Sequence, residues 1–167
     1  MVPSLVLVTL LGASAGCSGV MRMGMGPCVD TEGHPGFDLT LTLGIGSKGT
    51  MVTGRVGGGM SGEPTAGSFV GGVGLEGAGL VDREPIVLHG NVGYAGRTLD
   101  RLPKESLHGF SLGFGGAWAF DIRHSRLFGR QTFLDALGLM PHAEVLWSEG
   151  RPIGYFSFPI TLQRMSL

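Results

Sequence analysis

The segment Phe110–Ile122, with the sequence FSLGFGGAWAFDI, divides its side chains between two faces. The first face is mostly large and apolar: Phe110, Leu112, Phe114, Gly116, Trp118, Phe120 and Ile122. The second face is small and mildly polar: Ser111, Gly113, Gly115, Ala117, Ala119 and Asp121. Because side chains alternate between the two sides of a strand, the segment predicts a β-strand. The pairing of a lipophilic face with a narrow one is typical of a small closed barrel, with lipid outside and a crowded lumen inside.

The composition is unusual for a domain surrounded by water. Only 15% of the 167 residues are charged, whereas an ordinary soluble domain has about 25%. Thirteen acidic residues nearly balance twelve basic ones, so no broad field of one sign indicates a nucleic-acid partner. The 32 glycines recur inside apolar stretches such as Phe69–Leu75, where they allow sharp bending and close approach of backbones. The length fits one domain.

The amino-terminal residues 1–16 read as a signal peptide. An apolar run, Leu5–Leu11, is too short to span a bilayer and precedes a series of small residues. Ala13–Ala15 matches the small-x-small cleavage pattern, which predicts export across the inner membrane to the cell envelope. The run Ser14–Cys17 also resembles the lipobox of bacterial lipoproteins, which makes Cys17 a candidate for lipidation. If cleavage instead precedes Gly16, Cys17 is free to form a disulfide with Cys28.

The rest of the chain divides into a flexible lead-in at 17–36 and a β-barrel domain at 37–167. Alternation predicts strands at 37–46, 50–59, 68–80, 86–97, 110–122, 142–148 and 153–164. Ser47–Gly49 reads as a tight turn. The connections alternate between short and long if 127–134 is a further strand, which makes eight strands. The alternative is a helix over 131–140, because Phe133, Leu137 and Met140 have helical spacing.

Eight alternating strands behind a signal peptide resemble the small outer-membrane β-barrels of Gram-negative bacteria, the OmpA/OmpX-like class. The resemblance covers residues 37–164. It implies an all-β fold, an antiparallel up-and-down barrel of about eight Gly-rich strands, and a location in the outer membrane. Four aromatic residues fit the girdles at the membrane interfaces, with a soluble core as the alternative: Tyr94, Trp118, Trp147 and Tyr155.

Four polar residues are predicted to meet on the small-residue face of the strands. A symmetric turn at Asp82–Pro85 places Glu76 opposite Asn91, with His89 two residues away and Arg55 diagonal to Glu76. Such a cluster is either an active or gating site, or a polar plug that fills a narrow lumen. The plug is the favoured interpretation because buried charges need partners.

A barrel enzyme that hydrolyses lipids is a weaker hypothesis. Some outer-membrane barrels use His, Ser and an acid, and His142, Glu144 and Ser148 share one strand face here. No spacing in the chain guarantees that such groups meet, so we expect no catalytic residue. The sequence also shows no metal-binding or cofactor-binding motif, so none is predicted.

The sequence therefore predicts a non-enzymatic outer-membrane barrel with a structural or surface-interaction role. Its expected partners are membrane lipids and an extracellular or periplasmic protein, without nucleic acid, and the expected state is a monomer. The alternative is a lipoprotein anchored through Cys17, with a soluble lipocalin-like or sandwich domain that turns its apolar face inward to bind an apolar ligand.

Overall fold

The computed structural model describes residues 17–61, 66–82, 84–100, 105–125, 131–148 and 150–167. These residues form ten β-strands in antiparallel pairs, and they contain no helix that is long and apolar enough to cross a membrane. The strands are β1 (Cys17–Asp30), β2 (Pro35–Ser47), β3 (Thr50–Ser61), β4 (Ala66–Leu80), β5 (Ile86–Leu99), β6 (Glu105–Ser125), β7 (Gln131–Leu139), β8 (His142–Ser148), β9 (Arg151–Ser157) and β10 (Ile160–Ser166).

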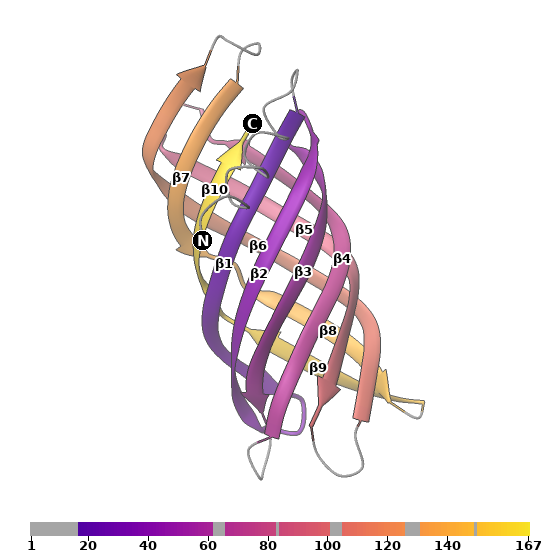
Figure 1. Ribbon diagram of the computed structural model, residues 1–167. Coiled ribbons are helices and arrows are strands. Elements are labelled where there is room, and N and C mark those ends of the chain that lie inside the picture. The colour runs from indigo at the N-terminus through magenta and orange to yellow at the C-terminus, as the bar shows by residue number, and fades with distance from the viewer. Residues whose placement is uncertain (1–16, 62–65, 83, 101–104, 126–130, 149) are drawn as a thin grey trace, which may run out of the picture.

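The ten strands occupy eight positions side by side around the sheet, which we call staves (Figure 1). A stave is either one long strand or two shorter strands that lie end to end. β7 and β8 both pair with β6, and they keep one register across the gap between them. Leu139 lies opposite Gly116, and His142 lies opposite Gly113, three residues further on each strand. β9 and β10 keep one register along β1 in the same way. The predicted count of eight therefore matches the staves, while two staves are each divided into two strands.

The staves close into a barrel because the last one pairs with β1. Pairing can be followed once around the wall through Gly19, Ile45, Val52, Leu75, Val92, Leu112, Ala143, Phe156 and Val29. The circuit returns to β1 ten residues beyond its start (29 − 19 = 10), which is the shear of the barrel. Eight staves with this shear tilt by about 40° from the barrel axis, within the usual range for closed barrels.

The lead-in predicted for 17–36 is wrong for Cys17–Asp30, which forms a full stave between β2 and β10. Its residues alternate like those of the other strands, with Met23 and Met25 exposed outside and Arg22 buried inside. The predicted strands 127–134 and 142–148 fall on a single stave instead of two, although 126–130 lie outside the described residues. The helix alternative over 131–140 is also wrong, since Gln131–Leu139 is a strand.

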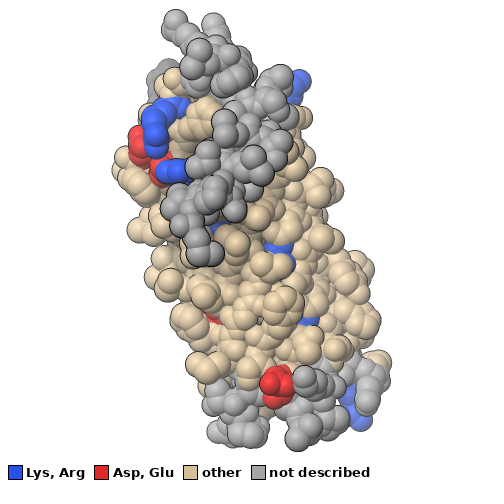
Figure 2. All heavy atoms as spheres, viewed as in Figure 1, with Lys and Arg blue, Asp and Glu red and all other residues tan. Residues whose placement is uncertain are grey.

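The outer wall carries the large apolar side chains, and the lumen carries the small and polar ones. Phe114 is 68% exposed and Val73 is 64% exposed, whereas Glu76 is 1% exposed. Charged atoms gather at the two ends of the visible face, with only small patches between them (Figure 2). A tilted strand of 12 to 15 residues rises about 30 to 38 Å along the axis, enough to cross the hydrocarbon core of a bilayer. The predicted orientation of the two faces is confirmed.

The proposed disulfide between Cys17 and Cys28 is incompatible with the fold. Both residues lie on β1, eleven positions apart, which separates their α-carbons by roughly 36 Å along a strand. A disulfide requires about 7 Å or less. Cys28 is a buried free thiol. The signal peptide at 1–16 lies outside the described residues, so export and lipidation of Cys17 stay predictions.

Candidate functional site in the polar lumen

The lumen has three layers along the barrel axis. An apolar layer closes the end that holds Cys17 and Leu167, and it contains Val20, Met51, Val87, Ala117, Ala119, Leu134, Ala136 and Met165. A second apolar layer closes the end beside the β8–β9 turn, and it contains Ala95, Leu99, Leu107, Leu146 and Tyr155. Buried polar and charged side chains fill the space between these layers, which we call the polar chamber.

One ion-pair group in the polar chamber is built on Glu76 of β4. Arg22 of β1 donates to both carboxylate oxygens of Glu76, with an Nη1 to Oε2 distance of 3.1 Å. The Nε of the same guanidinium donates to Gln163 Oε1 at 2.8 Å, and His89 Nδ1 lies 3.7 Å from Glu76 Oε1. The side chains of Arg22 and Glu76 are 3% and 0% exposed, so this bidentate pair is desolvated.

A second ion-pair group lies nearer the β8–β9 turn. Arg97 forms a bidentate pair with Asp38, with N–O distances of 2.7 and 3.0 Å. Glu144 accepts a hydrogen bond from Arg55 and lies 3.7 Å from Arg97. The guanidinium carbon of Arg97 also stands 4.6 Å from the ring centroid of Tyr155, in cation–π geometry. The two groups together balance three arginines with three carboxylates.

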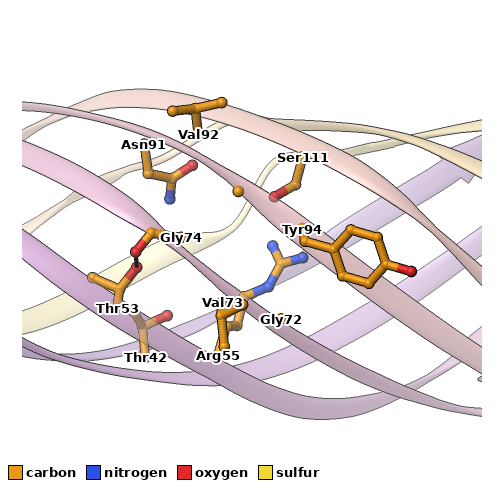
Figure 3. A pocket seen from close by; sticks show the side chains of 11 residues that line it. Thr42, Thr53, Arg55, Gly72, Val73, Gly74, Asn91, Val92, Tyr94 and Ser111 are labelled. Carbon is orange, nitrogen blue, oxygen red and sulfur yellow. Dashed lines mark hydrogen bonds between the residues drawn. The ribbon is translucent and has the colours of Figure 1, made fainter.

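Glycines make room for polar side chains between the two groups. A Cβ on Gly113 would lie 2.5 Å from His142 Nδ1 and 2.8 Å from Asn91 Oδ1, so both side chains occupy the space that a larger residue would need. A cavity of about 20 Å³ adjoins Asn91 and Arg55, and Figure 3 shows their side chains pointing into it together with Ser111. That volume suits about one water molecule. The chamber is therefore a packed interior with little free space.

The structure divides the predicted cluster between the two groups. Glu76 lies opposite Asn91 as predicted, and His89 is on the same buried face. Arg55 is not diagonal to Glu76: it lies opposite Gly72, four residues away on β4, and pairs with Glu144. The residues do fill the lumen, but the partner of Glu76 is Arg22.

Sequence reasoning missed Arg22, Asp38, Arg97 and Gln163. A usable signal was present, because Arg97 shares the alternation of His89 and Asn91, and Asp38 shares that of the small-residue face of its strand. Arg22 lies in the segment 17–36, for which the sequence predicts a flexible lead-in and therefore no inward face.

The residues considered for hydrolysis do not form a triad. His142 and Ser148 stand on one strand six positions apart, which is roughly 20 Å. Glu144 faces the polar chamber and is committed to Arg55. Nucleophile and base therefore lie far outside hydrogen-bond reach.

Three of the four predicted girdle aromatics lie on the outer wall. Tyr94, Trp118 and Trp147 are exposed, and Trp147 packs edge-on against Phe110, with ring centroids 6.1 Å apart. Tyr155 contradicts the prediction, because it is 3% exposed and faces the lumen against Arg97. Tyr155 alternates with Phe156, which is exposed on the outer wall, so the ring of Tyr155 turns inward.

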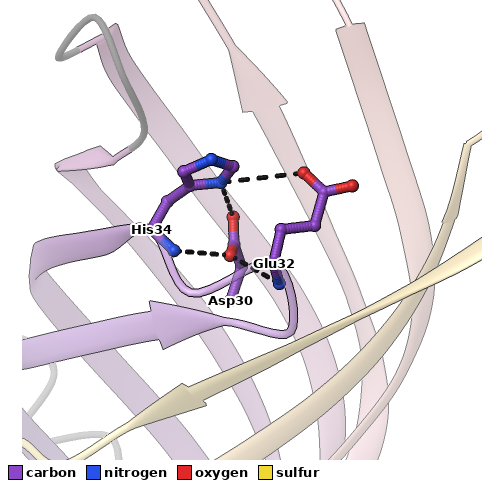
Figure 4. A group of neighbouring side chains, drawn as sticks. All are labelled: Asp30, Glu32 and His34. Atoms are coloured by element: carbon purple, nitrogen blue, oxygen red, sulfur yellow. Dashed lines mark hydrogen bonds and ion pairs between the residues drawn. The ribbon is translucent and has the colours of Figure 1, made fainter.

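The turn between β1 and β2 gathers three side chains with metal-ligating atoms, Asp30, Glu32 and His34, all within 4.8 Å of one another (Figure 4). Asp30 already accepts hydrogen bonds from the backbone N–H groups of Glu32 and His34, both at 2.9 Å. Partial burial would raise the pKa of Asp30, but these bonds and the His34 ring hold it below the ordinary value. The arrangement is explained as a capped turn at the rim.

Comparison with solved structures gives the same architecture. The chain resembles the crystal structure of Neisserial surface protein A (NspA), with a TM-score of 0.60 and 8% sequence identity over 89% of this chain and 96% of that one. The fold is that of a small outer-membrane β-barrel. A designed transmembrane β-barrel also matches, with a TM-score of 0.43 and 12% identity over 90% of this chain and 97% of that one. No family model and no curated protein sequence matches the chain.

Proposed function

We propose that the protein is an integral, non-conducting barrel of the outer membrane whose role is structural or depends on contacts made by its loops. The observation that carries the proposal is the belt of large apolar side chains on a closed sheet. Among the described residues, thirty large hydrophobic side chains are exposed, nearly all of them on the outer wall, which is far more than a water-soluble surface carries. Lipid is the solvent that suits such a wall.

The lumen supports a role without solute transport. Two apolar layers and a balanced set of ion pairs occupy it from end to end. An eight-stranded barrel is only wide enough for its own side chains. Interaction with lipids along the wall, and with a protein at the loops, is what remains for this architecture.

The lipocalin-like alternative does not fit the side-chain orientation. A soluble barrel that binds an apolar ligand buries its apolar face inward, whereas this barrel turns that face outward. Lipidation of Cys17 is compatible with the fold, since Cys17 begins β1 at the end that also holds the carboxyl terminus.

The test is heat-modifiability on a detergent gel, with washed outer membranes from cells that express the full chain or its Cys17→Ser variant. We expect both chains to migrate differently before and after boiling, and to resist carbonate extraction. A chain that shows no shift and leaves the membrane once Cys17 is replaced would be a lipid-anchored soluble domain, and the proposal would fail.

A further inference from the structure

Prolines interrupt the wall of the barrel at one level. Pro27 lies on β1, Pro141 in the gap between β7 and β8, and Pro159 in the gap between β9 and β10. Continuing the register across the gaps gives three neighbouring pairs: Pro27–Phe158, Pro159–Met140 and Pro141–Phe114. Among the pairings that join β2, β3, β4, β5 and β6, the same extension of register gives one proline pair, Pro85–Ala119, where Ala119 N–H donates to Pro85 O at 2.7 Å. That pair lies outside the proline row, at the end of the barrel beside the apolar layer that contains Val87.

Each of these pairs keeps one hydrogen bond and loses its reciprocal. The N–H groups of Phe158, Met140 and Phe114 donate to the opposite proline carbonyls at 3.0, 3.2 and 3.2 Å. Proline has no N–H to return the bond, although the two residues of a hydrogen-bonded pair in an antiparallel ladder normally exchange two. The ladder therefore lacks one hydrogen bond at each of three adjacent boundaries between staves, which we call seams.

The β8–β9 hairpin, His142–Ser157, begins and ends at this proline row. Its outer edge is joined to β1 by only three residue pairs, Cys28–Ser157 to Asp30–Tyr155, whereas β10 is joined to β1 by seven. Its inner edge is joined to β6 by six pairs. The outer edge is the weaker attachment, and at the rim it is held by Thr31, whose N–H donates to Gly154 O at 2.8 Å and whose Oγ1 accepts from Gly154 N at 3.1 Å.

The inner face of the hairpin closes the polar chamber. Leu146 and Tyr155 belong to the apolar layer at that end, and Glu144 belongs to the chamber itself. A cavity of about 10 Å³ lies behind the hairpin, lined among others by Gly26, Pro159 and Glu144.

Two buried polar atoms at this cavity, His142 Nδ1 and Glu144 Oε2, have no hydrogen-bond partner among the described residues. Buried polar atoms of this kind are usually satisfied by water, which needs a route past the apolar layers.

We propose that the β8–β9 hairpin is a hinged flap. It swings on its β6 edge about the proline row, parts from β1, and admits water from the rim to the polar chamber, while the apolar layer at the opposite end stays closed. Thr31 is the latch. The proposal goes beyond the structural role above, and it can be tested in detergent micelles whether or not the barrel resides in the outer membrane.

Cys28 is a native reporter for this motion, because it is 4% exposed, faces the lumen and sits opposite Ser157 on the seam that would part. The test measures labelling of Cys28 by a small water-soluble maleimide in the folded Cys17→Ser chain. The seam lock is an engineered disulfide between Val29→Cys and Phe156→Cys, which face each other across the same seam. The matched control lock joins Ile45→Cys and Val52→Cys across β2 and β3.

We expect the seam lock to slow labelling at least tenfold and reduction of that lock to restore it, while the control lock changes nothing. Thr31→Val should speed labelling severalfold. Pro159→Ala, which restores a donor, should slow it, whereas Pro152→Ala outside the row should not. Equal rates with and without the seam lock, or a thiol that reacts only after denaturation, would overturn the flap.

Discussion

The Glu76 carboxylate shows how single residues decide the stability of this lumen. Its side chain is fully buried, and its charge is offset by the bidentate contact with Arg22. Bringing both ions out of water is costly, so the pair itself adds little net stability. Removing only one partner is different, because the other charge then stays buried without compensation.

We therefore predict that Glu76→Gln and Arg22→Met each lower the free energy of unfolding by about 3 to 5 kcal/mol, and that the double variant loses less than the sum. Denaturant unfolding in detergent, followed by the gel shift, measures all three chains. Glu84→Gln, in an exposed turn, is the control. Additive losses would show that the two residues do not act as a pair.

Asp30, at the rim, is expected to make the free energy of unfolding depend on pH in the acid range. Because its pKa is lowered on folding, the carboxylate contributes stability above the unfolded value of 3.8, and this contribution is lost as pH falls below that value through the folded pKa. We predict a carboxyl titration by NMR with a midpoint below 3.8. Asp30→Asn should lower the unfolding midpoint more at pH 7 than at pH 3; an equal loss at both would contradict the assignment.

For single side chains, the sequence predicts contacts only as far as the local strand register reaches. A symmetric turn was enough to place Glu76 opposite Asn91, since both lie on adjacent strands. It was not enough to find Arg22, because contact between β1 and β4 crosses the lumen and depends on barrel closure. Alternation assigns a face to each side chain, but closure decides which side chains meet across it.

Among the elements, β1 and the divided staves show where the pattern is weak. The segment before residue 37 alternates as well as any other, but Gly26 and Pro27 suggested a linker. On Gln131–Leu139, apolar residues have helical spacing, and the strand forms because β6 and β10 supply neighbours on both sides. In this segment, hydrogen-bonded pairing with the two neighbouring strands outweighs the local helical spacing of the apolar residues. The predicted count of eight is correct because two errors cancel. The prediction leaves out β1, and it counts the stave of β7 and β8 as two strands.

The β2–β3 hairpin offers a prediction at this scale. Its turn places Lys48 at φ 52° and Gly49 at φ 77°, both in the left-handed region that suits a two-residue hairpin. Gly49→Ala should cost about 1 to 2 kcal/mol of unfolding free energy, because it adds a Cβ at positive φ, whereas Lys48→Gly should be neutral or stabilising. Unfolding midpoints decide between these outcomes, and equal losses in both variants would show that the turn conformation is wrong.

For the whole molecule, the outer wall is the part that sequence predicts best. The second face of Phe110–Ile122 is small and carries a single charged residue, Asp121, so it offers water very little to solvate. The apolar face is therefore expected outside, in lipid, as the structure has it. The same reasoning cannot reveal the layers of the lumen, because they arise only when residues near the two ends of eight staves converge.

The apolar belt predicts a penalty that depends on position. Val73 lies in the middle of β4 with its side chain outside, so Val73→Arg should lower stability in a bilayer by about 2 to 4 kcal/mol. Glu84→Arg, beyond the belt, should have little effect. Folding into vesicles, followed by tryptophan fluorescence, gives both values, and a tolerated arginine at position 73 would place that part of the wall in water.

The layered lumen leads to a last prediction about transport. An ion that enters from either end meets buried apolar side chains such as Val87 and Leu146, both 0% exposed, before it reaches the ion pairs. Crossing the apolar layers removes its hydration without offering a replacement, and the chamber behind them is already neutral. We therefore expect no stepwise current in planar bilayers and no loss of a potassium gradient from vesicles, at protein amounts that give clear signals with a porin. Opening of the β8–β9 flap leaves the opposite apolar layer in place, so Thr31→Val should not conduct either. Discrete current steps from the folded chain would show that the layers do not seal the barrel.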